Sequence, residues 1–245
     1  MADEINFIKE RVEDLGNKYQ AFGYLTPEEF NREIKQAQMD EISEQRLRYE
    51  MGTISSDNLD SLKTTANISV SGSGVMTKPA DYLFFDSAQY VVFYTDSKGI
   101  QKQTIVPIEP VTTNQEADRV SSELNPPNRY FPICVLKDTT IQFHPQTLGN
   151  VKLNYLKLPP DPFWNYVITS GQPVYAATGG SQTNPNNGSN DSTNVVLPFQ
   201  LIPNLIRRVC TQLGIQVRQA DIVQIMEQQQ QTNNIWVQKE SLQSS

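Results

Sequence analysis

Both ends of the chain have the hydrophobic spacing of helices. Between residues 5 and 15, apolar side chains recur three and four positions apart, which places them on one face of a helix. Thr26, Pro27 and Glu29 then carry the signature of a helix N-terminus: an N-cap, a proline at the first helical position and the acidic partner of a capping box. This second helix is predicted to continue, with a single apolar stripe, to about Glu50.

At the C-terminal end, apolar residues between positions 205 and 213 predict a helix that ends at Gly214. A last helix is predicted from Arg218, and its pattern is lost in the glutamines at 228–231. The final segment, 232–245, is polar apart from one apolar triplet, so we expect an extended tail there.

The middle of the chain alternates between apolar and polar residues, as strands with one buried face do. The clearest case is Val151, Leu153 and Tyr155, which alternate with polar residues and precede a proline-rich break at 159–162. The other predicted strands are Tyr82–Phe85, Gln89–Thr95, Ile100–Ile108, Arg129–Leu136 and Thr139–Phe143. The second and third of these flank a turn that contains glycine, so we expect a β-hairpin.

Together these patterns predict an α+β fold, in which helices from both ends form a bundle and an antiparallel β domain is inserted between them. Residues 64–78 are rich in Ser, Thr and Gly, and we interpret them as a connector or a weak edge strand. The expected organisation is N-terminal helices at 1–63, the β domain at 78–176, a flexible polar loop at 177–194, helices that complete the bundle at 195–231 and the tail at 232–245.

Charge is distributed unevenly along the chain, whose formal net charge is -7. Residues 1–60 contain 14 acidic and 7 basic side chains, and the rest of the chain contains 13 of each. A nucleic-acid-binding surface needs clustered Lys and Arg, which this balance does not favour. The N-terminal residues lack the pattern of a signal peptide, and no apolar run is long enough for a membrane span. Cys134 and Cys210 are expected to be reduced and buried.

The sequence does not present a catalytic centre, a cofactor site or a metal site that we can recognise. The one histidine, His144, could act as a general base, but it has no evident nucleophile or metal partner, so a turn or surface position is favoured. The Cys and His spacing of zinc sites and the acidic run of calcium loops are missing. The glycine-rich stretches lack the strand-to-helix context and the lysine of a phosphate loop.

Aromatic and apolar residues suggest contacts between subunits instead. Trp164 and Tyr166, next to Phe163, could stack on a sugar or a base, but a place in the core or at a subunit interface fits better without basic neighbours. The triplet in the tail either packs on its own domain or docks on a neighbouring subunit. The candidate interface residues are Trp164, Tyr166, Ile235, Trp236 and Val237.

Four segments taken together resemble a known family. They are the capped helix LTPEEFNREIKQAQMDEISEQR, the segment PADYLFFDSAQY, the strand pair TTIQFHPQTLGNVKLNYLKLPPDPFWNY and the final helical unit LIPNLIRRVCTQLGIQVRQADIVQIMEQQ. In this combination, which spans residues 25–231, the chain resembles the ring proteins of crAss-like bacteriophages, which are head-to-tail connectors or tail adaptors. The alternating strand followed by Pro-Pro-x-Pro-x-Trp carries most of the resemblance, and the loop at 176–194 and the glutamine-rich tail depart from it.

The resemblance implies a virion protein, made in the host cytoplasm, that forms a homo-oligomeric, twelve-fold ring below the portal and around the DNA exit channel. It implies contacts with other copies, the portal and neighbouring tail or ring proteins, and only non-specific proximity to packaged DNA. The sequence patterns themselves predict no membrane contact, no cofactor and no enzyme activity. An acidic segment suits a channel through which DNA must slide, because like charges suppress adhesion. The alternatives are a tail-tube or minor capsid component and a glycan-binding β module that would use the Trp164 patch.

Overall fold

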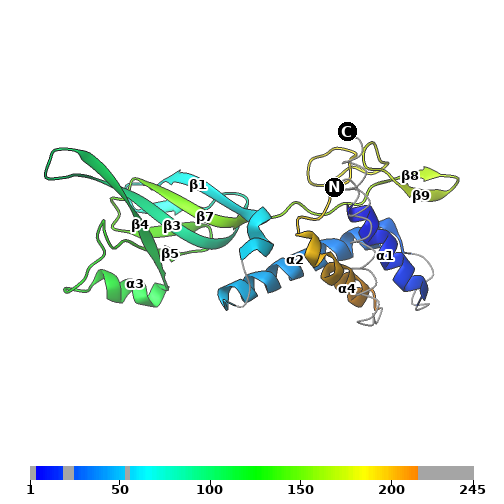
Figure 1. Ribbon diagram of the computed structural model, residues 1–245, viewed down its shortest axis with the longest axis horizontal. Coiled ribbons are helices and arrows are strands. Elements are labelled where there is room, and N and C mark those ends of the chain that lie inside the picture. Colours follow the sequence, from blue (N-terminus) through cyan, green and yellow to red (C-terminus); the bar gives the residue numbers. More distant parts are fainter. Residues whose placement is uncertain (1–3, 19–24, 53–55, 215–245) are drawn as a thin grey trace, which may run out of the picture. The chain divides into compact units, whose positions relative to one another are not determined.

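A computed structural model of the chain describes residues 4–18, 25–52 and 56–214 (Figure 1). The chain forms two compact units: the sheet unit is residues 62–158, and the helical unit combines residues 1–61 with 159–245. The elements are α1 Glu4–Lys18, α2 Pro27–Glu50, η1 Ser56–Leu62, β1 Lys63–Ser69, β2 Val75–Thr77, β3 Tyr82–Thr95, β4 Gln101–Val111, α3 Thr113–Val120, β5 Ile133–Leu136, β6 Thr140–His144, β7 Asn150–Lys157, β8 Tyr166–Thr169, β9 Gln172–Tyr175, η2 Phe199–Leu201 and α4 Ile202–Gln212.

The sheet unit is one seven-stranded, nearly closed, barrel-like sheet with the strand order β1-β7-β3-β4-β5-β6-β2. Its neighbouring strands are antiparallel except for β4 and β5, which are parallel and are joined by a crossover through α3. The predicted hairpin is confirmed as β3 and β4. Its turn ends at Gly99, whose φ of 78° lies in the left-handed region that a side chain would disfavour.

The core of the sheet unit follows from the alternation in β7. Val151, Leu153 and Tyr155 are buried, as their spacing predicts, while Lys152 between them is exposed. They pack with buried residues from β2, β3, β4, β5 and β6 and from the turn before β7. These residues are Met76, Ala88, Ile108, Cys134, Ile141, Phe143 and Leu148.

The fold class predicted from the sequence is wrong. The described residues form mostly β-sheet with four short helices, and they are not a helical bundle that carries an inserted antiparallel β domain. One reason is the segment at 64–78, for which the Ser, Thr and Gly content left open a connector or a weak edge strand, and the structure shows edge strands. It contains β2 and all but the first residue of β1, which pairs with β7 from Lys63↔Leu156 to Ser69↔Asn150. The two edges of the sheet therefore come from this segment. The helix predicted from Arg218 lies outside the described residues.

Among its described residues, the helical unit contains the α-helices α1, α2 and α4. The capping box is confirmed, because the Glu29 backbone N–H donates to Thr26 Oγ1 at 3.2 Å and the Thr26 N–H donates to Glu29 Oε2 at 3.2 Å. The apolar stripes predicted for α1, α2 and α4 are buried, and α4 packs against both other helices. Gln38 of α2 is 1% exposed. Its amide donates to the Pro160 carbonyl at 3.2 Å and accepts from the Val196 N–H at 2.9 Å, so it holds two distant segments on the helix.

The polar loop at 177–194 belongs to the helical unit and follows the hairpin β8–β9. Its composition predicts no buried side chains, yet Asn165 and Asn184 are fully buried around it. The Asn165 amide donates to the Gln182 carbonyl at 2.7 Å, and the Asn184 amide donates to the Asp191 carbonyl at 2.7 Å. Hydrogen bonds to buried asparagines therefore take the place of an apolar core in this loop.

Candidate functional site: an exposed apolar end of the sheet unit

The β3–β4 hairpin extends beyond the neighbouring strands β7 and β5 of the sheet. The pairing of β3 with β7 ends at Tyr90↔Val151, and the pairing of β4 with β5 begins at Glu109. Among the described strands, residues 91–95 of β3 and residues 101–108 of β4 therefore pair only with each other's strand. We call residues 91–105 the arm, and Figure 1 shows it projecting past the rest of the sheet. Both of its outer edges present unpaired backbone groups, as edge strands do.

One face of the arm is apolar and exposed. Residues directly opposite each other in an antiparallel pair lie on the same face, so Val91, Ile105 and Phe93 share one face of the arm. Phe93 is 67% exposed and Ile105 is 62% exposed. A two-stranded ribbon is at best marginally stable by itself in water. A long ribbon with exposed apolar side chains has the character of an interaction element.

The tip of the arm is held by a single carboxylate. Asp96 Oδ1 accepts the backbone N–H groups of Ile100 at 3.0 Å and Lys98 at 2.8 Å, and Oδ2 pairs with the Lys102 ammonium at 3.0 Å. The hydrogen bond from the Ile100 N–H, with those from Lys102 and Lys98, lowers the pKa of Asp96 below its usual value. The turn is therefore pre-formed in the free chain.

The crossover between β4 and β5 adds a second apolar group. The helix α3 buries none of its side chains. It is tied to the sheet by polar contacts: Glu116 Oε1 lies 2.7 Å from His144 Nε2, and Arg119 pairs with Glu109 at 3.0 Å. The exposed large apolar side chains of α3 and of the following loop, 121–132, are Val120, Leu124, Tyr130 and Phe131.

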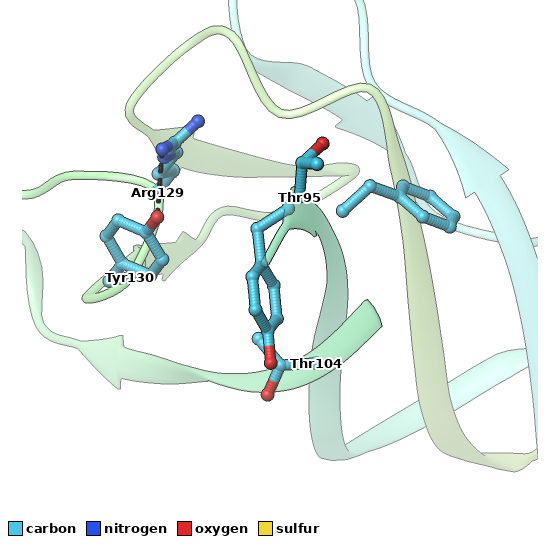
Figure 2. Close-up of a pocket in the computed structure, with 6 residues that line it drawn as sticks. Thr95, Thr104, Arg129 and Tyr130 are labelled. Atoms are coloured by element: carbon cyan, nitrogen blue, oxygen red, sulfur yellow. Dashed lines mark hydrogen bonds between the residues drawn. The ribbon is translucent and has the colours of Figure 1, made fainter. Parts of the chain in front are cut away.

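An open hollow of about 790 Å³ lies between the arm and this loop, and Figure 2 shows Arg129 and Tyr130 on one side of it and Thr95 and Thr104 on the other. Phe93 and Tyr94 complete its lining. Arg129 Nη2 donates to the Tyr130 hydroxyl at 2.8 Å, and its guanidinium carbon lies 4.8 Å from the centre of the Tyr130 ring.

The guanidinium of Arg129 has N–H donors beyond the one that it donates to the Tyr130 hydroxyl. An arginine carries five N–H donors, and no carboxylate in the described part of the chain pairs with this one. The hollow thus combines a cation without a carboxylate partner, aromatic surface and two threonine hydroxyls. This is the chemistry that receives an acidic group flanked by apolar side chains.

The two units differ in charge. Residues 62–158 contain eight acidic and nine basic side chains, whereas the two segments of the helical unit contain 19 acidic and 11 basic side chains. The helical unit therefore carries a net charge of -8 and the sheet unit a net charge of +1. The sheet unit is therefore nearly neutral, and the negative charge of the chain is concentrated in the helical unit.

A second apolar group is exposed on the helical unit, at the C-terminal end of α2. Leu47 is 51% exposed and Met51 is 66% exposed. Glu50, also exposed, lies on the same helix face, because residues three and four apart are neighbours on a helix surface. We call Leu47, Glu50 and Met51 the α2 end.

The structure places Trp164, one of the candidate interface residues, inside the helical unit. Its side chain is 2% exposed, and its indole Nε1 donates to Asn6 Oδ1 at 3.0 Å. The Lys9 ammonium lies 4.4 Å from the ring centre, and Tyr166 stacks on it with 5.7 Å between centroids. Trp164 is therefore a core residue of the helical unit. Its ring is not exposed, so the structure does not support a glycan-binding role for the Trp164 patch.

The remaining sequence candidates have different outcomes. Tyr166 is half-buried, and its hydroxyl donates to Glu28 at 3.2 Å, so a subunit contact through it stays a prediction. Burial, with this hydrogen bond, raises the pKa of Tyr166. The apolar triplet Ile235, Trp236 and Val237 lies outside the described residues.

His144 is not an isolated surface residue. Its imidazole pairs with Glu116 and is 17% exposed, so it links β6 to α3. Within residues 4–18, 25–52 and 56–214, no group of three or more His, Cys, Asp or Glu side chains is arranged to hold a metal ion. No helix in the same ranges is long and apolar enough to cross a membrane.

Sequence reasoning missed the arm and the hollow. The alternation of residues 89–108 predicts the hairpin. Its exposure, however, depends on where β7 and β5 stop pairing with it, and these pairings join residues that are far apart in the sequence. Arg129 is distant from Tyr94 in the sequence, and no local motif joins them. Neither known protein families nor curated proteins give a match to this sequence.

Proposed function

We propose that this chain is a virion structural protein that forms a homo-oligomeric ring in the neck or tail of a phage and connects the portal to the tail around the DNA channel. The observation that carries the proposal is the arm, a pre-formed ribbon that exposes apolar side chains and two unpaired strand edges. Contact with another protein subunit would bury these apolar side chains and pair these strand edges.

A ring requires heterologous contacts, in which one surface of a subunit meets a different surface of the next. The chain offers two distinct apolar surfaces, one on the sheet unit around the arm and one at the α2 end. Repulsion between the acidic helical units disfavours a contact between two of them, whereas the nearly neutral sheet unit carries no such penalty. The resemblance to connector proteins of crAss-like phages points to the same kind of assembly.

The charge also suits a DNA channel. The helical unit carries the entire net negative charge, and a negative lining repels phosphates and lets packaged DNA pass without adhering. We therefore expect the helical unit to contribute to the channel surface, and the portal and neighbouring tail or ring proteins to contact other parts of the ring.

The direct test is quantitative mass spectrometry of purified particles that encode this chain. A ring component should be present at about a dozen copies per particle, the symmetry expected from the resemblance. Complete absence from the particle would overturn the proposal. A tail-tube component would instead be present at several times that number, because a tube stacks many rings.

A test in solution addresses the arm itself. Substituting Phe93→Ser together with Ile105→Ser should abolish oligomers that the wild-type chain forms, as measured by light scattering and negative-stain electron microscopy. Ile168→Ser is the matched control, because Ile168 is 59% exposed on the separate hairpin β8–β9. Unchanged oligomers in the arm variant, with circular dichroism unaltered, would show that another surface drives assembly.

A further inference from the structure

We propose that Asn187 is a site of spontaneous deamidation, and that one of the two products opens the turn at 184–189 in the polar loop. The inference is independent of the proposed ring. Asn187 precedes Gly188, and it is the one asparagine in the sequence that is followed by glycine. Both residues are exposed, so water reaches the peptide bond between them.

The reaction uses the chain and one molecule of water. The backbone nitrogen of Gly188 loses its proton and attacks the side-chain carbonyl carbon Cγ of Asn187. The Cγ–Nδ2 bond then breaks and ammonia leaves, so that a five-membered succinimide ring remains. Water opens this ring at either of its two carbonyl groups. Opening at Cγ gives aspartate with the original backbone, and opening at the main-chain carbonyl gives isoaspartate, whose backbone runs through Cβ and Cγ. No atom is oxidised or reduced.

The first support is the space around the attacking nitrogen. Gly188 has no Cβ to hinder the approach of its nitrogen to the Asn187 side chain. Even a Cβ added at Gly188 would meet no atom of the described residues within 4 Å. The loop therefore leaves room for the succinimide ring to form.

The second support is the hydrogen bond at the carbonyl that is attacked. The Ser189 backbone N–H donates to Asn187 Oδ1 at 3.0 Å, as in an Asx-turn. This donor polarises the side-chain carbonyl, and it stabilises the negative charge that develops on Oδ1 when the Gly188 nitrogen attacks Cγ.

A third contact controls the rate. The Gly188 N–H donates to the Asn184 carbonyl at 2.9 Å, so the folded turn holds the proton that the attacking nitrogen must lose. The reaction therefore proceeds when this hydrogen bond opens, and the local stability of the turn sets how often that happens.

The two products have different effects on the turn. Besides the hydrogen bond from Gly188, the Asn184 N–H donates to the Ser189 carbonyl at 2.7 Å. The aspartate form keeps the original backbone, and its carboxylate can still accept the Ser189 N–H. The isoaspartate form adds one CH₂ group to the backbone inside the turn, which shifts both main-chain hydrogen bonds. Asn184 is fully buried and its side chain holds the Asp191 carbonyl at 2.7 Å, so the change passes to the rest of the loop.

Peptide mapping by mass spectrometry tests the site. The full chain is incubated at mildly alkaline pH, and every asparagine-containing peptide is followed for the conversion of an amide to a carboxyl group. Asn190 is the internal control, because it is exposed in the same loop but precedes Asp191. We expect Asn187 to convert about tenfold or more faster than Asn190. Asn187→Gln should not convert, because its longer side chain does not form the five-membered ring.

An unconverted Asn187, or an equal or faster reaction at Asn190, would overturn the inference. In urea the reaction at Asn187 should accelerate, because the hydrogen bond from Gly188 to Asn184 is lost. An equal rate in the folded and unfolded chains would contradict the control of the rate by the turn.

The Asn187→Asp variant separates the added charge from the altered backbone. When freshly prepared, it carries the charge of both products on the original backbone. The isoaspartate form, isolated by chromatography from aged wild-type chain, should be cleaved between residues 177 and 194 by a non-specific protease faster than this variant and the unmodified chain. Equal cleavage of the isoaspartate form and of Asn187→Asp would show that the turn stays closed, and would overturn the proposed effect on the loop.

Discussion

Arg208 of α4 donates from Nε to the buried carboxylate of Glu41 on α2 at 2.6 Å. Glu41 is 1% exposed and also accepts a hydrogen bond from Gln45 at 2.7 Å. The same guanidinium pairs with Glu44, one helical turn further along α2. Two helices that are far apart in sequence are therefore joined by a charge pair whose carboxylate has little access to water.

We expect Arg208→Met to lower the free energy of unfolding by about 3 kcal/mol, because it leaves the carboxylate of Glu41 buried without its cation. Replacing both residues in Glu41→Met/Arg208→Met should recover most of this loss, since a buried ion pair adds little over apolar side chains of similar size. Urea unfolding followed by circular dichroism measures both values. A double variant as unstable as the sum of the single variants would contradict this account.

Asn31 of α2 binds the backbone on both sides of Trp164. Its side-chain amide donates to the Trp164 carbonyl at 3.1 Å, and its Oδ1 accepts the Trp164 N–H at 2.8 Å. Asn31→Ala should therefore cost about 2 kcal/mol of stability by leaving two partly buried backbone groups unpaired. Thermal unfolding measures the loss, and Arg32→Ala, at the exposed neighbouring position, should change little. Equal effects of the two substitutions would sink the argument.

The helices were predictable because their signals are local. The capping box of Thr26 and Glu29 and the apolar stripes of α1 and α4 lie within a few residues of the structure that they specify. Gly214 has the positive φ expected of a residue that follows a helix end. In each case the pattern that specifies the helix lies within the helix or the residues that flank it.

The fold class was not predictable in the same way, because it depends on which strands pair. The strand β1 has no strong pattern of its own, and Ala66 meets its partner Leu153 from a distant part of the sequence. The parallel pairing of β4 with β5 leaves no periodic signature that distinguishes it from an antiparallel pair. These long-range pairings join the strands into one nearly closed, barrel-like sheet, which the local patterns do not reveal.

The candidate site was hidden for a related reason. An apolar residue in a strand is normally read as buried, and Phe93 and Ile105 become exposed only because β3 and β4 continue past their neighbours. Trp164 was expected in the core or at a subunit interface, and the structure buries it within the helical unit. Asn6 and Lys9, which contact the Trp164 ring, come from α1 near the N-terminus and are distant from Trp164 in the sequence.

Gly180 is required where the polar loop passes over Asn165. A Cβ at this position would lie 2.2 Å from Asn165 Cγ, far inside normal contact. Gly180→Ala should therefore displace Asn165, break its hydrogen bonds to the loop and cost about 1–3 kcal/mol, the usual range for overpacking. Gly72→Ala is the control, because a methyl group there would meet no atom of the described residues within 4 Å and its φ is not in the left-handed region. Differential scanning calorimetry should separate the two variants.

If Gly180→Ala melts at the same temperature as the wild-type chain, the loop is not held tightly against Asn165. Asn165→Ala gives an independent check, since it removes the side chain that the added methyl would meet. The double variant Asn165→Ala/Gly180→Ala should then be no less stable than Asn165→Ala alone, because the steric conflict is gone.

The two cysteines report on the two units separately. Cys134 lies in the sheet unit and Cys210 in the helical unit, and burial raises the pKa of both thiols to about 12. At pH 8 we expect the folded chain to react very slowly with a disulfide reagent, because only the thiolate reacts and neither thiol is accessible. Denaturant should release both thiols. Rapid labelling of the native chain would contradict the burial of these side chains.

The same pKa shifts set a limit on stability at alkaline pH. A thiol whose folded pKa lies above its ordinary value of 9.0 contributes stability that is fully present below pH 9 and is lost as the pH rises toward about 12. The free energy of unfolding should therefore fall between pH 9 and 12. Cys134→Ala and Cys210→Ala should each reduce this fall. In each single variant the remaining thiol should react with the reagent at the rate at which the unit that contains it opens. Different rates for the two variants would show that the units open independently, and identical rates would show that the chain unfolds as one.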